Sequence, residues 1–257
     1  MSHHHHQQII SQFTQQAIPF AQLPGHLDSI DLLLELTNPT RQDTVLDLAC
    51  GPGLVACAFA RHAGQVTGID ITPAMLEQAA KRQQEQGLNN LLWQLGDVQA
   101  LPYADNSFSQ VITRYSFHHV QQPQQALAEM IRVCKPGGTV LVADVALPAE
   151  KSAAYDRLEI MRDPSHTHAL TTAEFSDLFL HSGLQDCRQA GYSVELELEA
   201  QLRASFPLPG DEERIRALVI ADIGRDQLGI NARHQNGAVQ YSVPISVYTG
   251  RKPDVAV

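Results

Sequence analysis

Apolar residues recur with two different spacings along this chain, and the change of spacing separates an N-terminal segment from the rest. Between residues 7 and 36 they return every three or four positions, which is typical of helices with one buried face. Pro24-Gly25 interrupts this pattern, because proline cannot continue a helix and glycine favours a turn. We therefore expect two N-terminal helices.

Short apolar runs alternate with helical segments between residues 37 and 147. Strands are expected at 45–50, 65–70, 91–97, 109–117 and 139–147, and helices at 54–63, from Pro73 onward, and at 124–135. Strands that alternate with helices predict right-handed β-α-β units. The fold class is therefore α/β: a doubly wound, mostly parallel sheet with helices on both faces.

The rest of the chain is less regular. Residues 148–170 are polar and are expected to lack regular structure. The remaining expected elements are a helix at 171–184, a strand at 187–199, a helix around 213–223 and a closing strand at 237–252.

Charge and cysteine content narrow the function classes. The net charge is −10, and the 18 basic residues form no dense run, which argues against nucleic-acid or anionic-membrane partners. The four cysteines show no metal-type spacing and are expected to be free thiols. No signal-like or membrane-spanning run is evident, so we expect a cytoplasmic protein. The tract His3–His6 is expected to take no part in the fold, with metal binding as the alternative.

The stretch VLDLACGPG, from Val45 to Gly53, carries the first chemical signal. Asp47 lies on a buried strand, and Gly51 and Gly53 remove side chains from the turn that follows. The helix that begins at Leu54 directs free backbone N–H groups toward the same point. Ligands of open parallel sheets bind at the carboxyl ends of the strands. The stretch therefore predicts a ligand site, with a simple tight loop as the alternative.

Two further carboxylates end the next two strands. Asp70 closes the second strand and Asp97 follows the third. A carboxylate at the second strand tip is suited to a ribose diol. Three acids at neighbouring strand ends fit a ligand with an adenosine end and a cationic end, and would repel a pyrophosphate. Alternatively, Asp70 and Asp97 are helix caps.

Four ordered motifs, VLDLACGPG, VTGIDITPAMLEQA, GDVQALPYADNSFSQVITRYSFHHV and RVCKPGGTVLVAD, carry a family resemblance over about residues 44–145. They resemble class I S-adenosylmethionine-dependent methyltransferases, and within these the small-molecule group similar to ubiquinone/menaquinone C-methyltransferases. The resemblance implies a Rossmann-like, seven-stranded sheet whose last strand is antiparallel. It also implies a helical lid at 1–36 and a methyltransferase domain at 37–257, with substrate-lid insertions near 148–170 and 200–236.

The same resemblance implies cofactor contacts at the matching positions. The cofactor would be S-adenosyl-L-methionine, with S-adenosyl-L-homocysteine as the product. Its methionine end would meet Asp47, Ala49, Gly51, Gly53 and Arg114, its ribose Asp70, and its adenine Ile71, Met75, Asp97 and Val98. Phe13 and Phe20 on the lid helix would close over it, or that helix packs on the core instead.

Candidate catalytic residues lie beyond these motifs. His118 and His119 follow the fourth strand, and residues 161–170 gather further polar side chains in the expected crossover above the site. We expect catalytic roles for His166, His119 and Asp163, substrate contacts from Tyr115, His118, Arg162 and His168, and no metal. Phe206 and Tyr241 are further substrate candidates. The alternatives are a capping turn with solvated histidines and, for Tyr115, core packing.

These features predict methyl transfer to a carbon, oxygen or nitrogen atom of a small molecule. The protein would align the reacting atoms, and a general base would assist an acidic acceptor. Two alternatives keep the same cofactor: a non-methylating reaction, or noncatalytic binding. An NAD-dependent oxidoreductase is disfavoured, because the three strand-end acids would crowd a pyrophosphate.

Overall fold

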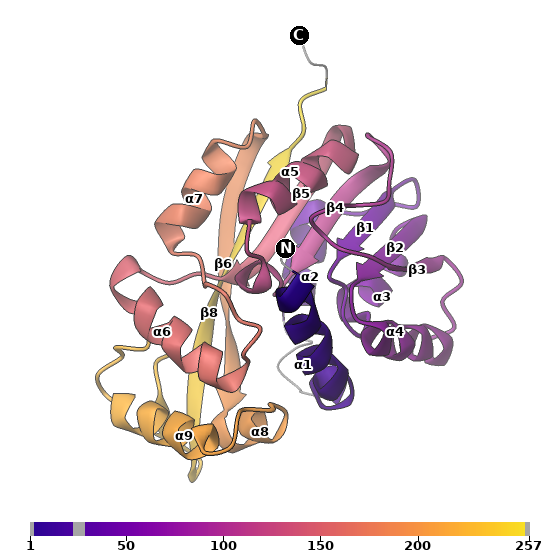
Figure 1. The fold of residues 1–257 in the computed structure, drawn as a ribbon. Helices are drawn as coiled ribbons and strands as arrows, with labels where there is room; N and C mark the ends of the chain where they lie inside the picture. The colour runs from indigo at the N-terminus through magenta and orange to yellow at the C-terminus, as the bar shows by residue number, and fades with distance from the viewer. Residues whose placement is uncertain (1–2, 23–28, 255–257) are drawn as a thin grey trace.

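The computed structural model describes residues 3–22 and 29–254, which form one sheet flanked by helices (Figure 1). The strands are β1 (Thr44–Leu48), β2 (Gln65–Asp70), β3 (Leu91–Leu95), β4 (Phe108–Arg114), β5 (Cys134–Val145), β6 (Gln185–Glu197), β7 (Arg233–Gln235) and β8 (Ala238–Arg251). The helices are α1 (His3–Gln22), α2 (Ile30–Thr37), α3 (Leu54–Ala60), α4 (Pro73–Glu85), α5 (Pro123–Val133), α6 (Ala149–Arg162), α7 (Thr172–Leu180), α8 (Leu198–Arg203) and α9 (Asp211–Asp222), with a short 3-10 turn at Phe117–His119.

The strand order is β3-β2-β1-β4-β5-β8-β6, with β7 paired to β8. Strands β1 to β5 pair in parallel, whereas β8 runs antiparallel to both β5 and β6. The expected doubly wound sheet with an antiparallel last strand is confirmed, and the three-residue β7 is an addition to it. The chain leaves β1 toward β2 and returns to β4 on the other side, so the order reverses between β1 and β4. That reversal opens a crevice at the carboxyl ends of these strands.

Each face of the sheet is covered by its own apolar cluster. One cluster joins residues of β1, β2, β4 and β5 to α2 and α3, and continues through α6, α8 and α9. The other packs α5 and α7 against the opposite side chains of the same strands. Because both faces are buried, adjacent residues such as Val45 and Leu46 are both inaccessible. This explains why the central strands read as continuous apolar runs.

Two sequence expectations about regular structure were wrong. Residues 148–170 contain α6, which was missed because its polar residues outnumber the apolar positions that mark its buried face. Strand β5 begins at Cys134 rather than at 139, because a shift in register between Phe108 and Gln110 absorbs the intervening Pro136-Gly137-Gly138.

The histidine tract also departs from expectation, because it forms the first turns of α1. His5 is buried, and its Nε2–H donates to the carbonyl of His119 over 2.7 Å. The tract therefore takes part in the fold. Helix α1 lies beside α4, over the carboxyl ends of the central strands (Figure 1). The expected break at Pro24-Gly25 falls outside the described residues.

All four cysteines are free, as the sequence predicted. Among the described residues, no helix combines the length and the apolar character needed to cross a bilayer.

Candidate active site

Two cavities adjoin one another under α1. The first, here the β1–β4 cleft, has about 880 Å³ of empty space and lies at the carboxyl ends of the central strands. The second, here the β5–β8 pocket, has about 700 Å³ and lies between α6 and the antiparallel strands. Phe13, Tyr115 and His119 line both cavities. These three side chains, here the neck, separate the two spaces.

Most residues expected at the cofactor line the β1–β4 cleft: Asp47, Ala49, Gly51, Asp70, Ile71, Met75, Asp97, Val98 and Arg114. Two expectations differ. Gly53 does not line the cleft: a Cβ there would meet Trp93 at 2.8 Å and Ala79 at 3.0 Å, so this glycine allows α3 to approach β3 and α4. Phe20 belongs to α1, but its side chain lies outside the described part of the chain.

Asp47 lines the cleft with a carboxylate oxygen that lacks a hydrogen-bond partner in the described residues. Its side chain is buried, and its Oδ2 makes no hydrogen bond within the described residues. Burial raises the pKa of this carboxyl to about 7, although the charge of Arg114 opposes the rise. A buried carboxylate oxygen normally has a partner. A cationic ligand group in the cleft would provide one and would favour the ionised form.

Asp70 connects the ends of two strands. Its Oδ2 accepts the N–H of Gly51 over 2.9 Å, and its Oδ1 accepts that of Thr72 over 2.8 Å. Burial raises its pKa, and these two bonds oppose the rise. Thr72, rather than Asp70, is the N-cap residue of α4. Each carboxylate oxygen still has a lone pair with which it could accept a ligand hydroxyl.

Asp97 has a backbone partner and a contact from α1. Its Oδ1 accepts the N–H of Gln99 over 2.9 Å, and its Oδ2 lies 3.2 Å from Nε2 of His6. The helix above the cleft therefore reaches the third of the predicted strand-end acids.

Backbone strain is concentrated at the cleft. Ala49 (φ 49°) and Tyr115 (φ 58°) adopt left-handed conformations just after β1 and β4. Such a conformation costs a residue with a Cβ roughly 1–2 kcal/mol. In this conformation Tyr115 points into the neck. Its hydroxyl lies 2.8 Å from that of Tyr192, and the guanidinium of Arg114 lies 4.6 Å from the centre of its ring.

A hydrogen-bonded chain fixes His119. The Ser165 hydroxyl donates to Oδ1 of Asp163 over 2.6 Å, and Ser165 Oγ lies 3.2 Å from Nδ1 of His119. Burial disfavours ionised Asp163, but the neighbouring His119 and Arg162, together with the bonds from Ser165 and Gln16, outweigh it and lower its pKa. Because an ionised carboxylate only accepts, Ser165 must give Asp163 its proton. His119 Nδ1 then carries the hydrogen, and Nε2 is left with a lone pair.

His118 and His119 differ in charge. Burial would lower the pKa of His118, but the charge and the 2.6 Å hydrogen bond of Asp144 outweigh it and raise that pKa. Burial lowers the pKa of His119, and the nearby His118 lowers it further, to about 3. The two rings lie 4.2 Å apart. The pair therefore combines a cationic His118, in the wall of the β5–β8 pocket, with a neutral His119 in the neck.

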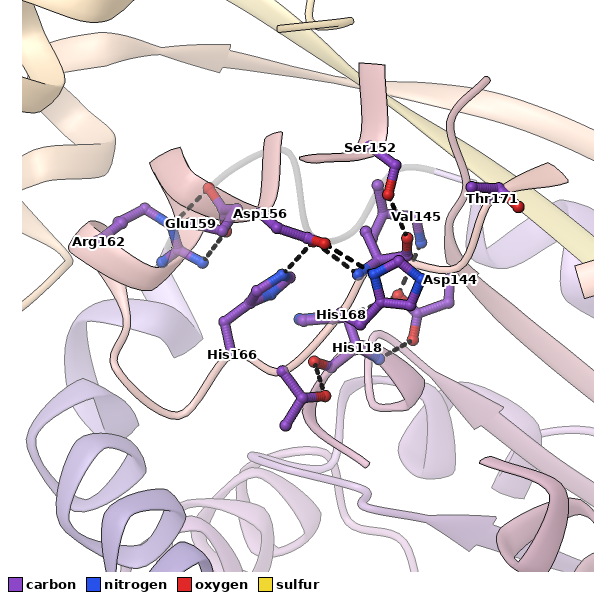
Figure 2. A network of polar contacts seen from close by, with 12 residues as sticks. His118, Asp144, Val145, Ser152, Asp156, Glu159, Arg162, His166, His168 and Thr171 are labelled. Atoms are coloured by element: carbon purple, nitrogen blue, oxygen red, sulfur yellow. Dashed lines mark hydrogen bonds and ion pairs between the residues drawn. The ribbon is translucent and has the colours of Figure 1, made fainter. Parts of the chain in front are cut away.

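Segment 161–170 enters the site only in part. Arg162 and Asp163 line the β5–β8 pocket, whereas His166 and His168 line neither cavity. Figure 2 shows both histidines directed at Asp156 of α6, with Nε2 of His166 and Nδ1 of His168 each 2.7 Å from it. Sequence reasoning could not anticipate this arrangement, because the segment before Arg162 was not expected to be a helix. Tyr241 lines the pocket as suggested, and Phe206 does not.

Several residues of the β5–β8 pocket were not predicted. They are Gln16, Asp144, Tyr155, Glu159 and Gln201, together with an apolar set of Val145, Val194, Leu196, Val243 and Ile245. Tyr155, Glu159 and Arg162 are spaced by four and three residues, so they share one face of α6. Asp144 near the end of β5 repeats the strand-end pattern of Asp47 and Asp70. Across residues 3–22 and 29–254, no group of three or more histidine, cysteine or acidic side chains is arranged to hold a metal ion.

Comparison with known proteins agrees with this geometry. A family model described as a methyltransferase domain matches residues 46–142. The chain is 30% identical over 215 residues to the "Uncharacterized methyltransferase YcgJ" of Bacillus subtilis, covering 82% of this chain and 84% of that protein. It is 43% identical over 108 residues to the ubiquinone/menaquinone biosynthesis C-methyltransferase UbiE of Desulfotalea psychrophila, which covers 41% of this chain and 43% of that protein. The match to UbiE thus spans less than half of either chain.

Solved structures share the fold. The crystal structure of YcgJ from Bacillus subtilis superposes with a TM-score of 0.80 at 24% identity, covering 88% of this chain and 99% of that one. Phosphoethanolamine N-methyltransferase 2 of Haemonchus contortus, in complex with S-adenosyl-L-methionine, superposes with a TM-score of 0.61 at 17% identity, covering 88% and 52%. At these identities the likeness concerns the fold.

Replacing Gly53 by alanine should destabilise the fold through both strain and crowding. Its φ is +76°, and the new Cβ would meet Trp93 and Ala79. Gly87→Ala is the matched control, because its φ is +63° and nothing lies within 4 Å. We expect Gly87→Ala to lower the free energy of unfolding by about 1–2 kcal/mol, and Gly53→Ala by about 1–3 kcal/mol more. Urea denaturation measures both, and equal losses would contradict the packing role.

The His118–Asp144 pair should make stability depend on pH. A raised pKa of folded His118 means that its contribution is complete below the ordinary histidine value of about 6.5, and is lost as pH rises through the folded value. The lowered pKa of Asp144 keeps its own contribution constant in this range. The difference in free energy of unfolding between wild type and His118→Gln should therefore shrink as the pH rises above about 6.5.

His168→Gln is the control for this pH series, because the His168 side chain is 41% exposed and its ion pairs are screened. Its pH-dependent difference from wild type should be the smaller one. A difference for His118→Gln that stays constant with pH would show that the pair adds no pH-dependent stability.

Proposed function

The chain belongs to the S-adenosylmethionine-dependent methyltransferases, and we propose that it methylates a small molecule bound in the β5–β8 pocket. The observation that carries this proposal is the neck. Methyl transfer is an in-line displacement, so donor and acceptor must face each other across a short, dry path. Two cavities that share Phe13, Tyr115 and His119 offer such a path.

The β1–β4 cleft fits the cofactor through the chemistry of its walls. The unpartnered Oδ2 of Asp47 suits the ammonium at the methionine end, and Asp70 suits the ribose hydroxyls. Ile71 and Met75 provide apolar contact for the adenine, with Asp97 and Val98 at its edge. When bound, S-adenosylmethionine supplies a methyl group on a positively charged sulfur.

The position of the pocket beneath several helices favours a small acceptor over a macromolecule. The β5–β8 pocket lies beneath α1, α6 and α8 and is lined largely by buried side chains. We assign α1 the role of a lid, because His5 and Gln16 hydrogen-bond to residues at the two cavities and His6 lies 3.2 Å from Asp97. Segments 149–170 and 198–236 provide the acceptor side in this proposal.

We assign His119 as the general base. Its Nε2 carries a lone pair in the tautomer that Ser165 imposes, and no described residue bonds to that atom. His119 can therefore accept the proton that an acidic acceptor loses as its nucleophilic atom takes the methyl group. A positioned base contributes roughly 10²–10⁴-fold when its pKa lies near the operating pH. Because the pKa of His119 is lowered to about 3, we expect its contribution at the low end of that range. Ser165 and Asp163 act as positioning residues.

The function is tested with methyl-labelled S-adenosylmethionine and a size-fractionated cell extract. We expect label in a small-molecule product, release of S-adenosylhomocysteine and cofactor-induced thermal stabilisation. Asp70→Ala should weaken cofactor affinity about tenfold or more in calorimetry, since a charge-assisted contact is lost. Asp43→Ala, which removes a turn-bound carboxylate remote from both cavities, is the control. Label only in protein or nucleic acid would refute a small-molecule acceptor, and cofactor binding without turnover would favour a noncatalytic role.

Once a product is identified, His119→Gln should lower kcat by about 10²-fold, the low end for a positioned base, while leaving S-adenosylhomocysteine affinity nearly unchanged. Ser165→Ala should produce a smaller loss in kcat, because His119 is then free to adopt the other tautomer. Ser152→Ala is the matched control, because the hydroxyl of this buried serine donates to the carbonyl of Ala169 and the residue lies outside both cavities. Wild-type turnover in His119→Gln would remove this residue from the mechanism.

A further inference from the structure

We propose that the β5–β8 pocket contains a subsite that selects an uncharged acceptor, a planar hydroxylated ring compound whose far end carries a hydroxyl or carbonyl oxygen. The inference rests on the proposed function and extends it by naming the substrate class. The subsite, here the distal subsite, comprises Tyr155, Tyr241, Gln201 and the Glu159–Arg162 pair.

Polar groups that face the pocket without a partner in the described residues are the first observation. The side chains of Tyr155 and Tyr241 are largely buried, at 4% and 6% exposure, and both line the pocket. Their hydroxyls form no hydrogen bond with the described residues and are not among the fully buried unpartnered atoms, so each is accessible from the pocket. Oε1 of Gln201 is buried and without a partner in the described part of the chain. A buried polar group that lacks a hydrogen bond costs about 1–3 kcal/mol. All three side chains line the same pocket, so one ligand could satisfy them.

The charge within the distal subsite is already neutralised. Arg162 binds Glu159 through Nε at 2.9 Å and Nη2 at 2.6 Å, as Figure 2 shows. Its Nη1 has only a 3.4 Å contact with the Ser205 hydroxyl. An arginine held by a carboxylate retains little attraction for a second anion. The subsite therefore presents hydrogen-bond donors to an oxygen atom without demanding a charge.

The pocket as a whole also disfavours an anion. Burial raises the pKa values of Asp144, Glu159 and Asp163, but their charged and hydrogen-bonding partners outweigh burial, so all three pKa values are lowered. The pocket therefore contains three ionised carboxylates. Two cations, Arg162 and His118, oppose them. One negative charge remains in excess. The positive sulfur of the methyl donor would balance it, which leaves a neutral acceptor as the best electrostatic match.

The floor of the pocket explains why the ligand should be planar. Val145 lies opposite Ile245, and Val194 opposite Val243, on paired antiparallel strands. Leu196 lies opposite Tyr241 in the same register. Paired side chains on one face of a sheet lie about 5 Å apart and form a continuous surface. An apolar ring can rest on this surface, with its far oxygen at Tyr155 and Tyr241 and its reacting atom toward His119.

Three catechols that differ only at the far end test the charge selectivity. Hydroxytyrosol ends in an alcohol, dihydroxyphenylacetate in a carboxylate and dopamine in an ammonium group. Calorimetry is done on the full chain saturated with sinefungin, a cofactor analogue with an amine in place of the methylsulfonium. We expect hydroxytyrosol to bind at least tenfold more tightly than either charged probe. Equal or tighter binding of a charged probe, or no binding of any of the three, would overturn the inference.

Tyrosine variants test the subsite itself. Tyr241→Phe and Tyr155→Phe should each weaken hydroxytyrosol binding by about three- to tenfold, the worth of one hydrogen bond. They should leave the affinity for dihydroxyphenylacetate unchanged, whereas a structural defect would weaken both probes. Tyr103→Phe is the control, because its hydroxyl is also without a partner in the described residues but lies outside both cavities. Unchanged hydroxytyrosol affinity in both subsite variants would remove the tyrosines from the site.

Failure of this inference differs from failure of the proposed function. If sinefungin binds and labelled methyl enters a small molecule, but the probes show no preference for the alcohol, only the substrate class is wrong. If sinefungin itself does not bind, the proposed function is wrong as well.

Discussion

Buried carboxylates at the ends of strands hold this site together. A parallel strand that ends inside a protein leaves backbone N–H groups that need acceptors. Asp70 accepts from Gly51 and Thr72, and Asp144 accepts from Phe117 and Val145. Asp70 thus connects the end of β2 to the turn after β1 and to the start of α4. Asp144 connects the end of β5 to the 3-10 turn at Phe117–His119. The same groups thereby shape the loops and set the charge of the cavities that the loops enclose.

At the neck, fixed loops and hydrogen bonds determine how the side chains that face the ligand are oriented. Left-handed Ala49 and Tyr115 are held in place by the surrounding sheet, and each lies next to the cleft. Strain of this kind persists where the structure around it overdetermines the conformation, as it commonly does at functional sites. The chain of Asp163, Ser165 and His119 adds a second constraint, since it fixes which ring nitrogen carries the proton. The site thus combines a strained backbone at two positions with hydrogen bonds that hold the facing side chains in one arrangement.

The sequence was informative where local chemistry and topology coincide. The strand-end acids and glycines near Asp47 and Asp70 could be placed because parallel strands bring their carboxyl ends to one edge, whatever the details of packing. The β5–β8 pocket could not be derived in this way. Three of its polar residues, Tyr155, Glu159 and Arg162, come from a helix whose amphipathic pattern is weak. Its floor comes from the register of β8 with β5 and β6. His166 was misplaced for a related reason, since its partner Asp156 belongs to that unpredicted helix.

The placement of the histidine tract has a practical consequence for work with this protein. His5 is buried against the loop that carries His119, and His6 reaches Asp97. Immobilised nickel or an antibody that captures these imidazoles would compete with the seating of α1 over both cavities. Purification handles are therefore better fused beyond β8 than in front of α1, and kinetic constants from amino-terminally tagged preparations need a tag-free reference.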